Sequence, residues 1–294
     1  MSNLVQRTLS GAAYVAVVVA SILVHPLAFA GVFLIVSTLA VREWHMLLGD
    51  GRHTRWNGMI LNILLFAMSG LFMYYMYNLS SNAYEWCVAC MGICAALYVV
   101  MLISSLVTEL CLSSRAQPAK HWGDLLTGQV MVALPFCCMT QLLTLDKWLL
   151  LTVFVLLWVN DTMAYCTGML TAKRTNGNHK MAPYISPKKS WEGLIGGAVF
   201  TIGAAILLAH FGWLSKLPAA SFGRFWYMYA AGFGLVAVIG GTLGDLMESL
   251  LKRSIGVKDS GRFLPGHGGV LDRFDSLLLA APLLLIYAII ISTI

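Results

Sequence analysis

The stretch SLLKRSIGVKDSGRFLPGHGGVLDRFD, from Ser249 to Asp275, lies between two strongly apolar segments. Eight of its 27 residues are charged, whereas only 11% of the whole chain is charged. A soluble domain typically carries about 25% charged residues. The apolar segments around this stretch are long enough to predict membrane-spanning helices, and similar segments recur along the whole chain.

The composition predicts an all-α, polytopic membrane protein. Hydrophobic residues make up 59% of the 294 residues, and the mean hydropathy is +0.78. We predict a single integral-membrane domain over residues 1–294, because no linker interrupts the pattern. About nine transmembrane helices are expected, and only His25-Pro26 separates the first two. The predicted spans are 9–25, 27–48, 57–78, 86–107, 125–145, 147–171, 191–212, 225–250 and 275–294.

The basic residues are distributed unequally between the two sides of these predicted spans. With nine spans, 16 of the 19 basic residues fall on the side of the N-terminus. The other side holds Lys147, Lys216 and Arg224. Because cytoplasmic loops carry the excess of Lys and Arg, we expect a cytoplasmic N-terminus and an external C-terminus.

Two N-terminal patterns have alternative interpretations. Arg7, the apolar run 12–24 and the small residues before Gly31 resemble a cleavable signal, but apolar sequence resumes at once, which favours a retained span. Cys87, Cys90 and Cys94 share a helical face and could bind a metal. No histidine or second CxxC completes such a set, which favours packing as small apolar side chains.

An acidic residue interrupts the sixth predicted span in the sequence WVNDTMAY. Asp161 lies in the half of this span that we place toward the cytoplasm. Ionisable residues inside a span are costly and usually functional. The alternative is a structural one, in which Asp161 pairs with a lysine and holds two helices together.

The segment HKMAPYISPKKSWEG, residues 179–193, predicts an anion site. Its two prolines favour an extended chain before a helix that opens near Ser190. Ser186, Lys188 and Lys189 arrive at this helix start, where cations and free N–H groups attract phosphate. The alternative is a basic anchor for anionic lipid head groups.

Carboxylates lie at both ends of the opening stretch. Asp245, Glu248, Ser249 and Lys252 follow an i, i+3, i+4, i+7 spacing, which places them on one helical face. After the glycine-rich PGHGG, two further acids, Asp272 and Asp275, follow at i, i+3, and we expect them to face the first set. Oxygen-only clusters suit Mg²⁺ together with phosphate oxygens. The pattern indicates phosphoryl or nucleotidyl transfer on a membrane-embedded substrate.

The opening stretch resembles the signature of the phosphatidate cytidylyltransferase (CDP-diacylglycerol synthase) family. The resemblance extends to NDTMAY, to SPKKSWEG and to the pair Glu43-Trp44, and it is vaguer before residue 155, so that the helices of 1–124 are the more variable part. One departure is GMLTAKRTNGNHK, which replaces a shorter glycine-rich run. The matching signature positions are Ser249, Lys252, Arg253, Lys258, Asp259, Gly261, Leu264, Pro265, His267, Gly268, Gly269, Asp272, Arg273 and Asp275.

The resemblance implies transfer of CMP from CTP to phosphatidate, with Mg²⁺ required and a second cation such as K⁺ expected beside it. It implies that Asp245 and Asp272 hold the metal, and we expect Glu248 and Asp275 next to them. We expect the basic groups to contact phosphates, and Asp161 and Asp259 to support substrate binding. His267 is expected either to donate to a phosphate or to shape the turn. The basic groups are Lys252, Arg253, Lys258, Arg273, Lys188 and Lys189, with Ser186 beside them.

Three rival functions would each require different features. A CTP-dependent polyprenol kinase would need a base for its alcohol nucleophile and would release CDP. A transporter would spread its acids across the bilayer, whereas these cluster at one face. A CDP-alcohol phosphotransferase would carry a DGxxAR motif, which is absent. We expect CTP, phosphatidate and the lipid bilayer as partners, no nucleic acid, and a bacterial inner membrane location with a cytoplasmic site; the chain could also form a homodimer.

Overall fold

The computed structural model describes residues 3–78, 81–111, 118–175, 177–214, 226–261 and 268–293. These residues form two compact units. The first unit comprises Met1–Thr144 and Val257–Phe274, and the second comprises Leu145–Gly256 and Asp275–Ile294. The predicted single domain stays a prediction. The signature stretch contributes to both units, because its middle belongs to the first unit and its two ends to the second.

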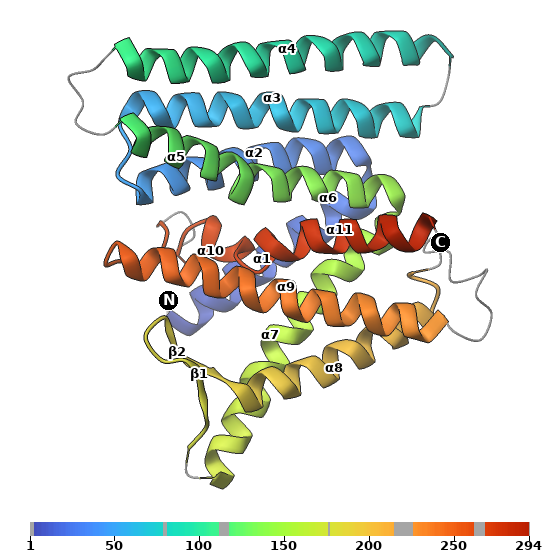
Figure 1. Cartoon of the computed structure of the whole chain (residues 1–294). Helices are drawn as coiled ribbons and strands as arrows, with labels where there is room; N and C mark the ends of the chain where they lie inside the picture. Colours follow the sequence, from blue (N-terminus) through green and yellow to red (C-terminus); the bar gives the residue numbers. More distant parts are fainter. Residues whose placement is uncertain are drawn as a thin grey trace. The chain divides into compact units, whose positions relative to one another are not determined.

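The first unit is built around helix α2 (Figure 1). Helix α2 packs against α1, α3, α5 and the π-helical turn η1, and α3 in turn packs against α4. His25 and Pro26 follow the end of α1 and open α2: the His25 side chain accepts from Leu27 N, and proline occupies the first position of the helix. The elements are α1 (Asn3–Val24), α2 (Pro26–Leu47), α3 (Arg52–Tyr77), α4 (Ser81–Cys111), α5 (Pro118–Gly128), η1 (Gln129–Ala133), α6 (Leu134–Leu145) and α10 (Leu271–Phe274).

An aromatic cluster fixes α10 within the first unit. The ring of Phe274 lies 5.9 Å from that of Phe33, 5.3 Å from that of Phe136 and 5.6 Å from that of Tyr14. These rings come from α2, α6 and α1. Such edge-to-face and tilted pairs add to the free energy gained from burial itself. The end of the signature stretch is thereby anchored to three apolar helices.

The second unit contains the other long helices and one small sheet. Helix α8 packs against both α7 and α9, and α9 packs against α11. Strands β1 and β2 pair as an antiparallel hairpin, with Lys180 opposite Ser190. We had expected only extended chain here, so the hairpin is an addition to the all-α prediction. The elements are α7 (Lys147–Thr175), β1 (Lys180–Ala182), β2 (Ser186–Ser190), α8 (Trp191–His210), α9 (Trp226–Ser254) and α11 (Leu277–Thr293).

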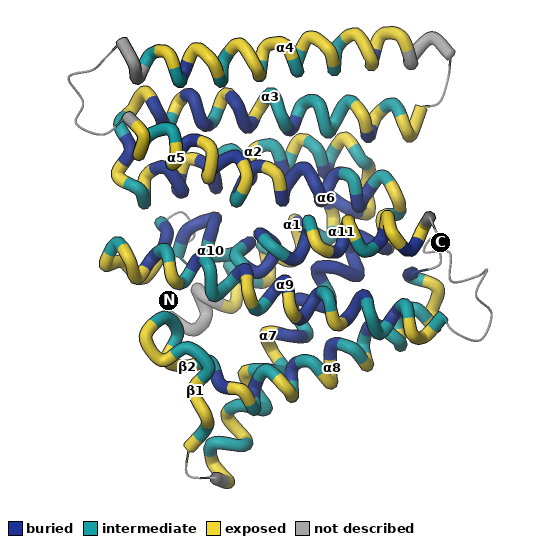
Figure 2. Tube along the Cα trace, viewed as in Figure 1, coloured by how far each residue is buried: buried dark blue, intermediate teal, exposed yellow. Residues whose placement is uncertain are grey.

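The predicted all-α, polytopic membrane architecture is confirmed. Among the described residues, eight helices are long and apolar enough to cross a membrane, and Thr8–Val24 is a shorter apolar helix. Only 6% of the apolar part of helix α4 is buried, and Figure 2 shows that α4 is mostly exposed whereas most of α6 is buried. Exposed apolar side chains of this kind suit contact with lipid tails.

One predicted span boundary was wrong. The fifth span begins at Pro118 rather than at residue 125, because charged Lys120 and Asp124 lowered the hydropathy of a turn that is nevertheless helical. The ninth predicted span, 275–294, matches α11, which the short helix α10 precedes.

Gly244 allows α9 to approach the turn that precedes α11. A Cβ atom at this position would lie 2.5 Å from the carbonyl oxygen of Asp275, which is backbone and cannot swing away. We therefore expect Gly244→Ala to lower the free energy of unfolding by about 1–3 kcal/mol. The measurement is thermal unfolding of the protein in detergent. The matched control is Gly203→Ala in α8, whose Cβ would meet nothing within 4 Å. Equal melting temperatures for the two variants would contradict the close approach.

Candidate functional site

One face of α9 carries four polar side chains that contact each other in pairs. Ser249 Oγ donates to Asp245 Oδ1 at 3.2 Å, and Lys252 Nζ lies 2.6 Å from Glu248 Oε2. Glu248 is fully buried and the Lys252 side chain is 10% exposed. The i, i+4 spacing within a helix brings the members of each pair together. The sequence had placed these residues on one face, and the structure brings them together there.

The hairpin and α7 add two more charges to this face. The Nζ atom of Lys189, on β2, lies 2.7 Å from Asp245 Oδ2. Asp161, on α7, lies close enough to Asp245 and Lys189 for their charges to interact. Because Ser190 caps α8 by accepting from Gly193 N at 3.1 Å, β2 ends at a fixed point that directs Lys189 toward α9.

Asp275 lies in the turn before α11 and completes the group. Its Oδ1 accepts from Ser276 N at 2.7 Å and from Ser276 Oγ at 3.3 Å. Its charge interacts with those of Asp245, Glu248 and Asp161. The second unit thus gathers charged side chains from four places in the chain, which we call the α9 cluster. Its members are Asp161, Lys189, Asp245, Glu248, Lys252 and Asp275.

Carboxylates outnumber lysines in the α9 cluster by four to two. Like charges at short range in a partly buried place repel strongly unless a cation compensates them. The carboxylates offer only oxygen atoms as metal ligands, and hard divalent cations prefer oxygen. The arrangement can therefore hold a cation, and its lysines can neutralise phosphate oxygens.

Asp272 belongs to the first unit, where it organises a loop. Its Oδ2 accepts from Ser260 N at 2.8 Å and from Gly269 N at 2.7 Å. Gly268 adopts a φ of 84°, a conformation that L side chains rarely adopt. Asp245 belongs to the other unit, so the predicted shared metal ligation by Asp245 and Asp272 stays a prediction.

Glu43 is a buried carboxylate that contacts the signature loop, a role that the sequence did not predict. Its Oε2 accepts from Ser260 Oγ at 3.1 Å and from Leu271 N at 2.9 Å. Gly261 and Gly269 leave the room that this side chain needs, since a Cβ at Gly261 would lie 2.6 Å from Glu43 Oε1. Glu43 thereby fastens α2 to both ends of the signature loop. The resemblance had singled out Glu43 with Trp44 but assigned it no role.

The other predicted site residues are placed as follows. Arg253 is exposed, and its Nε donates to Ile185 O at 3.3 Å. The carbonyl oxygen of Arg273 accepts from Tyr14 Oη at 3.3 Å. Ser186 begins β2, and His267 lies outside the described residues. Three further site residues are exposed: Lys188, Lys258 and Asp259.

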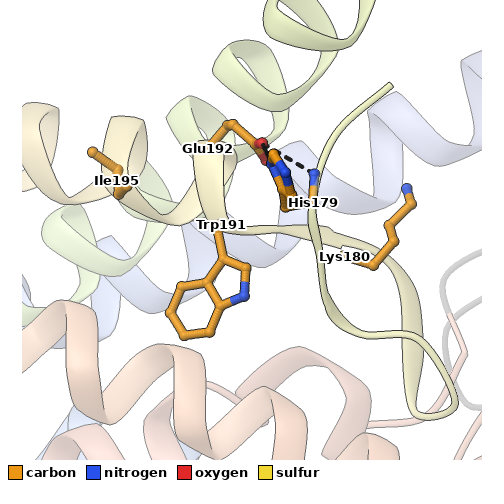
Figure 3. A pocket seen from close by; sticks show the side chains of 5 residues that line it. All are labelled: His179, Lys180, Trp191, Glu192 and Ile195. Atoms are coloured by element: carbon orange, nitrogen blue, oxygen red, sulfur yellow. Dashed lines mark hydrogen bonds and ion pairs between the residues drawn. The ribbon is translucent and has the colours of Figure 1, made fainter. Parts of the chain in front are cut away.

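A pocket of about 620 Å³ opens beside the start of α8 (Figure 3). Glu192 Oε1 accepts from His179 N at 3.0 Å and lies 2.7 Å from His179 Nδ1. This pair ties the residue before β1 to the first turn of α8. Lys180, Trp191 and Ile195 line the rest of the pocket. The sequence had not predicted it.

A second polar group lies in the first unit, which we call the Asp50 cluster: His45, Asp50, His121 and Asp124. The ligand atoms of Asp50, His121 and Asp124 lie within 4.8 Å of one another, close enough to hold a metal ion. Burial acts to raise the pKa of Asp50, but the hydrogen bond and charge of His45 outweigh it, so the pKa lies below its ordinary value. The sequence reasoning missed this group, although the i, i+3 spacing of His121 and Asp124 was a usable signal.

The sequence profile of the family described as "Cytidylyltransferase family" matches residues 5–291. A protein of Haemophilus influenzae named phosphatidate cytidylyltransferase is 38% identical over 182 residues, covering 58% of this chain and 60% of that protein. Proteins of the same name from Staphylococcus haemolyticus and Rickettsia felis are 43% and 36% identical. Those matches cover 46% and 56% of this chain, and 46% and 70% of the relatives.

The helices and the α9 cluster define an integral membrane protein with a polar site of carboxylates and lysines. The chain belongs to the cytidylyltransferase family, because the family profile matches nearly its whole length. It spans between about half and 70% of the length of the three relatives described.

Proposed function

We propose that this protein transfers CMP from CTP to phosphatidate, giving CDP-diacylglycerol and pyrophosphate. The observation that carries the proposal is the α9 cluster, in which four carboxylates and two lysines gather among apolar helices. Membership of the cytidylyltransferase family supports the reaction type, and the names of the relatives support the lipid substrate. A membrane-embedded site suits a lipid that lies in the bilayer.

The chemistry requires charge neutralisation more than a general base. The phosphate monoester of phosphatidate has a second pKa of about 6, so it is largely dianionic at neutral pH. One of its oxygens attacks the α-phosphorus of CTP, a new P–O bond forms, and the bond to the bridging oxygen of the β-phosphate breaks. Pyrophosphate leaves with that electron pair. No proton must be removed from the nucleophile, which agrees with a cluster that contains lysines and carboxylates.

The lysines are the groups that we assign to phosphate. Lys189 and Lys252 each carry an ammonium group with three N–H donors, and they pair with Asp245 and Glu248, respectively. The pairs also fix the position of each ammonium group before substrate arrives. We assign supporting phosphate contacts to the exposed Lys188 and Arg253, with Ser186, and to Lys258, Arg273 and His267 on sequence grounds. Asp259 is assigned a supporting role in substrate binding on the same grounds.

The donor set fits a divalent cation such as Mg²⁺. Asp245, Glu248 and Asp275 offer only oxygen atoms, and the excess of acids over lysines would be compensated by a cation. We propose these residues as its ligands in the second unit, Asp272 as a further ligand on sequence grounds, and a monovalent cation such as K⁺ beside it. When bound, Mg²⁺ would offset the negative charge of the triphosphate. Asp161 would orient Lys189 through its charge.

We further propose that the chain resides in a bacterial cytoplasmic membrane, with the N-terminus and the site on the cytoplasmic side. The relatives named above are bacterial, and the excess of basic residues on one side supports the orientation. A cytoplasmic site would have direct access to CTP.

The test is pyrophosphate release by the purified protein in mixed micelles containing CTP, phosphatidate and Mg²⁺, with each omitted in turn. We expect release only when all three are present. No release with phosphatidate, together with CDP formation from a polyprenol, would overturn the proposal and make the protein a lipid kinase.

A further inference from the structure

The Asp50 cluster joins two elements of the first unit that are distant in sequence. His45 lies near the end of α2, and Asp50 lies in the turn that follows it. His121 and Asp124 lie one turn apart on α5, which packs against α2. The cluster shares no residue with the signature stretch or with the α9 cluster, so its chemistry is independent of the proposed function.

The Asp50 side chain is buried and directs an unsatisfied oxygen into the cluster. The side chain is 1% exposed, and its Oδ2 lies 2.7 Å from His45 Nδ1. Its Oδ1 makes no hydrogen bond of standard geometry among the described residues, and it lies 3.4 Å from His121 Nδ1, an ion-pair distance when that ring is protonated. His121 Nδ1 and Asp124 Oδ2 are also buried without a hydrogen bond in the described part of the chain. Buried polar atoms normally have partners, so three such atoms together require an explanation.

The spacing of these atoms suits a shared metal ion. Zinc bonds to imidazole nitrogen and carboxylate oxygen are about 2.0–2.2 Å long, and at tetrahedral angles they place two ligand atoms about 3.3–3.5 Å apart. The 3.4 Å separation of Asp50 Oδ1 and His121 Nδ1 fits that value. The Asp124 carboxylate lies within 4.8 Å of both atoms and could provide the third ligand.

His45 holds Asp50 in the position that ligation requires. Ligating carboxylates are themselves hydrogen-bonded in well-formed metal sites. His45 is fully buried, and its ring fits against Gly58 and Gly128, where a Cβ at Gly128 would lie 3.0 Å from Nε2. The backbone N–H of Asp50 donates to the carbonyl oxygen of His45 at 3.0 Å. The Asp50 carboxylate is therefore oriented by both side chain and backbone.

We propose that Asp50, His121 and Asp124 bind one first-row divalent transition metal ion, with Zn²⁺ the best fit, and that His45 acts as the outer-shell partner of Asp50. An imidazole ligand beside two carboxylates favours such an ion over Mg²⁺, which prefers oxygen ligands and water. The bound ion would link the end of α2 to α5.

The experiment measures metal binding by the full chain in detergent. The protein is stripped with a chelator and titrated with Co²⁺, whose visible absorption reports ligation, in excess Mg²⁺ to occupy oxygen-only sites. Retained Zn²⁺ is then measured by elemental analysis after desalting. We expect one equivalent per chain, and a loss of affinity of at least about 10-fold in Asp50→Asn and in His121→Ala.

The controls change the same residue types elsewhere. Asp146→Asn alters an aspartate outside the cluster, and His53→Ala alters an exposed histidine of α3. Both variants should bind Co²⁺ and Zn²⁺ as the unaltered protein does. Asp124→Asn provides a second carboxylate variant if Asp50→Asn fails to fold, and Zn²⁺ should raise the melting temperature of the unaltered protein more than that of this variant. Absence of binding by the unaltered protein, or equal binding by the cluster variants and the controls, would overturn the proposal.

Discussion

Asp245→Asn should reduce pyrophosphate release by about 1,000-fold, because the substitution removes a charge from the centre of the α9 cluster. Asp245 contacts Lys189 at 2.7 Å and Ser249 at 3.2 Å, so it positions a lysine as well as offering an oxygen to a cation. The amide has the same shape, and the fold should survive. The measurement is the initial rate of pyrophosphate release in mixed micelles, with elution volume and melting temperature as checks on folding.

The matched control for this prediction is Asp146→Asn. Asp146 accepts from Trp148 N at 3.1 Å at the start of α7, and asparagine is an equally good residue for that position. This control should retain full activity. Asp272→Asn should also abolish turnover if the predicted shared metal ligation holds. Near-normal rates in both Asp245→Asn and Asp272→Asn would refute the metal assignment.

Glu43→Leu should destabilise the protein and inactivate it together. The substitution removes the acceptor for Ser260 Oγ and Leu271 N and leaves that amide buried without its partner. Hydrogen bonds to a charged group contribute about 1.5–3 kcal/mol each. We therefore expect a loss of roughly 3–5 kcal/mol on that basis, a melting temperature lower by on the order of 10 °C, and activity reduced at least about 10-fold as the signature loop loosens.

Two further variants make this prediction specific. Glu43→Gln keeps one carbonyl oxygen as an acceptor and should fall between the unaltered protein and Glu43→Leu. Glu85→Leu alters an exposed glutamate of α4 and should leave the melting temperature nearly unchanged. If Glu43→Leu melts and turns over like Glu85→Leu, Glu43 does not hold the loop.

The apolar helices could be predicted from the sequence because burial in lipid demands long runs without charge. The boundary at Pro118 could not, since Lys120 and Asp124 lie on a helical turn that hydropathy alone treats as a loop. The β1–β2 hairpin also escaped prediction. Prolines indicated extended chain there, but pairing of Lys180 with Ser190 depends on contacts between residues that local propensity does not report.

The polar residues of α9 could be predicted because their spacing is local. Asp245 meets Ser249, and Glu248 meets Lys252, each pair one turn apart on the same helix, so a periodicity of 3.6 is sufficient. Glu43 and Asp50 could not be assigned in this way. Glu43 meets Ser260 across 217 positions of the sequence, and Asp50 meets His121 on another helix. Such partners become visible only in three dimensions.

The pairing of Lys252 with Glu248 also has a consequence for how the chain enters the membrane. An unpaired charged residue within a membrane helix is costly to insert. Because Glu248 and Lys252 are i, i+4 neighbours on α9, they can neutralise each other as soon as that helix forms. The partner of Asp245, Lys189, precedes α9 in the chain and has already been synthesised when α9 emerges. Both acids can thus find their cations during synthesis, without waiting for α11.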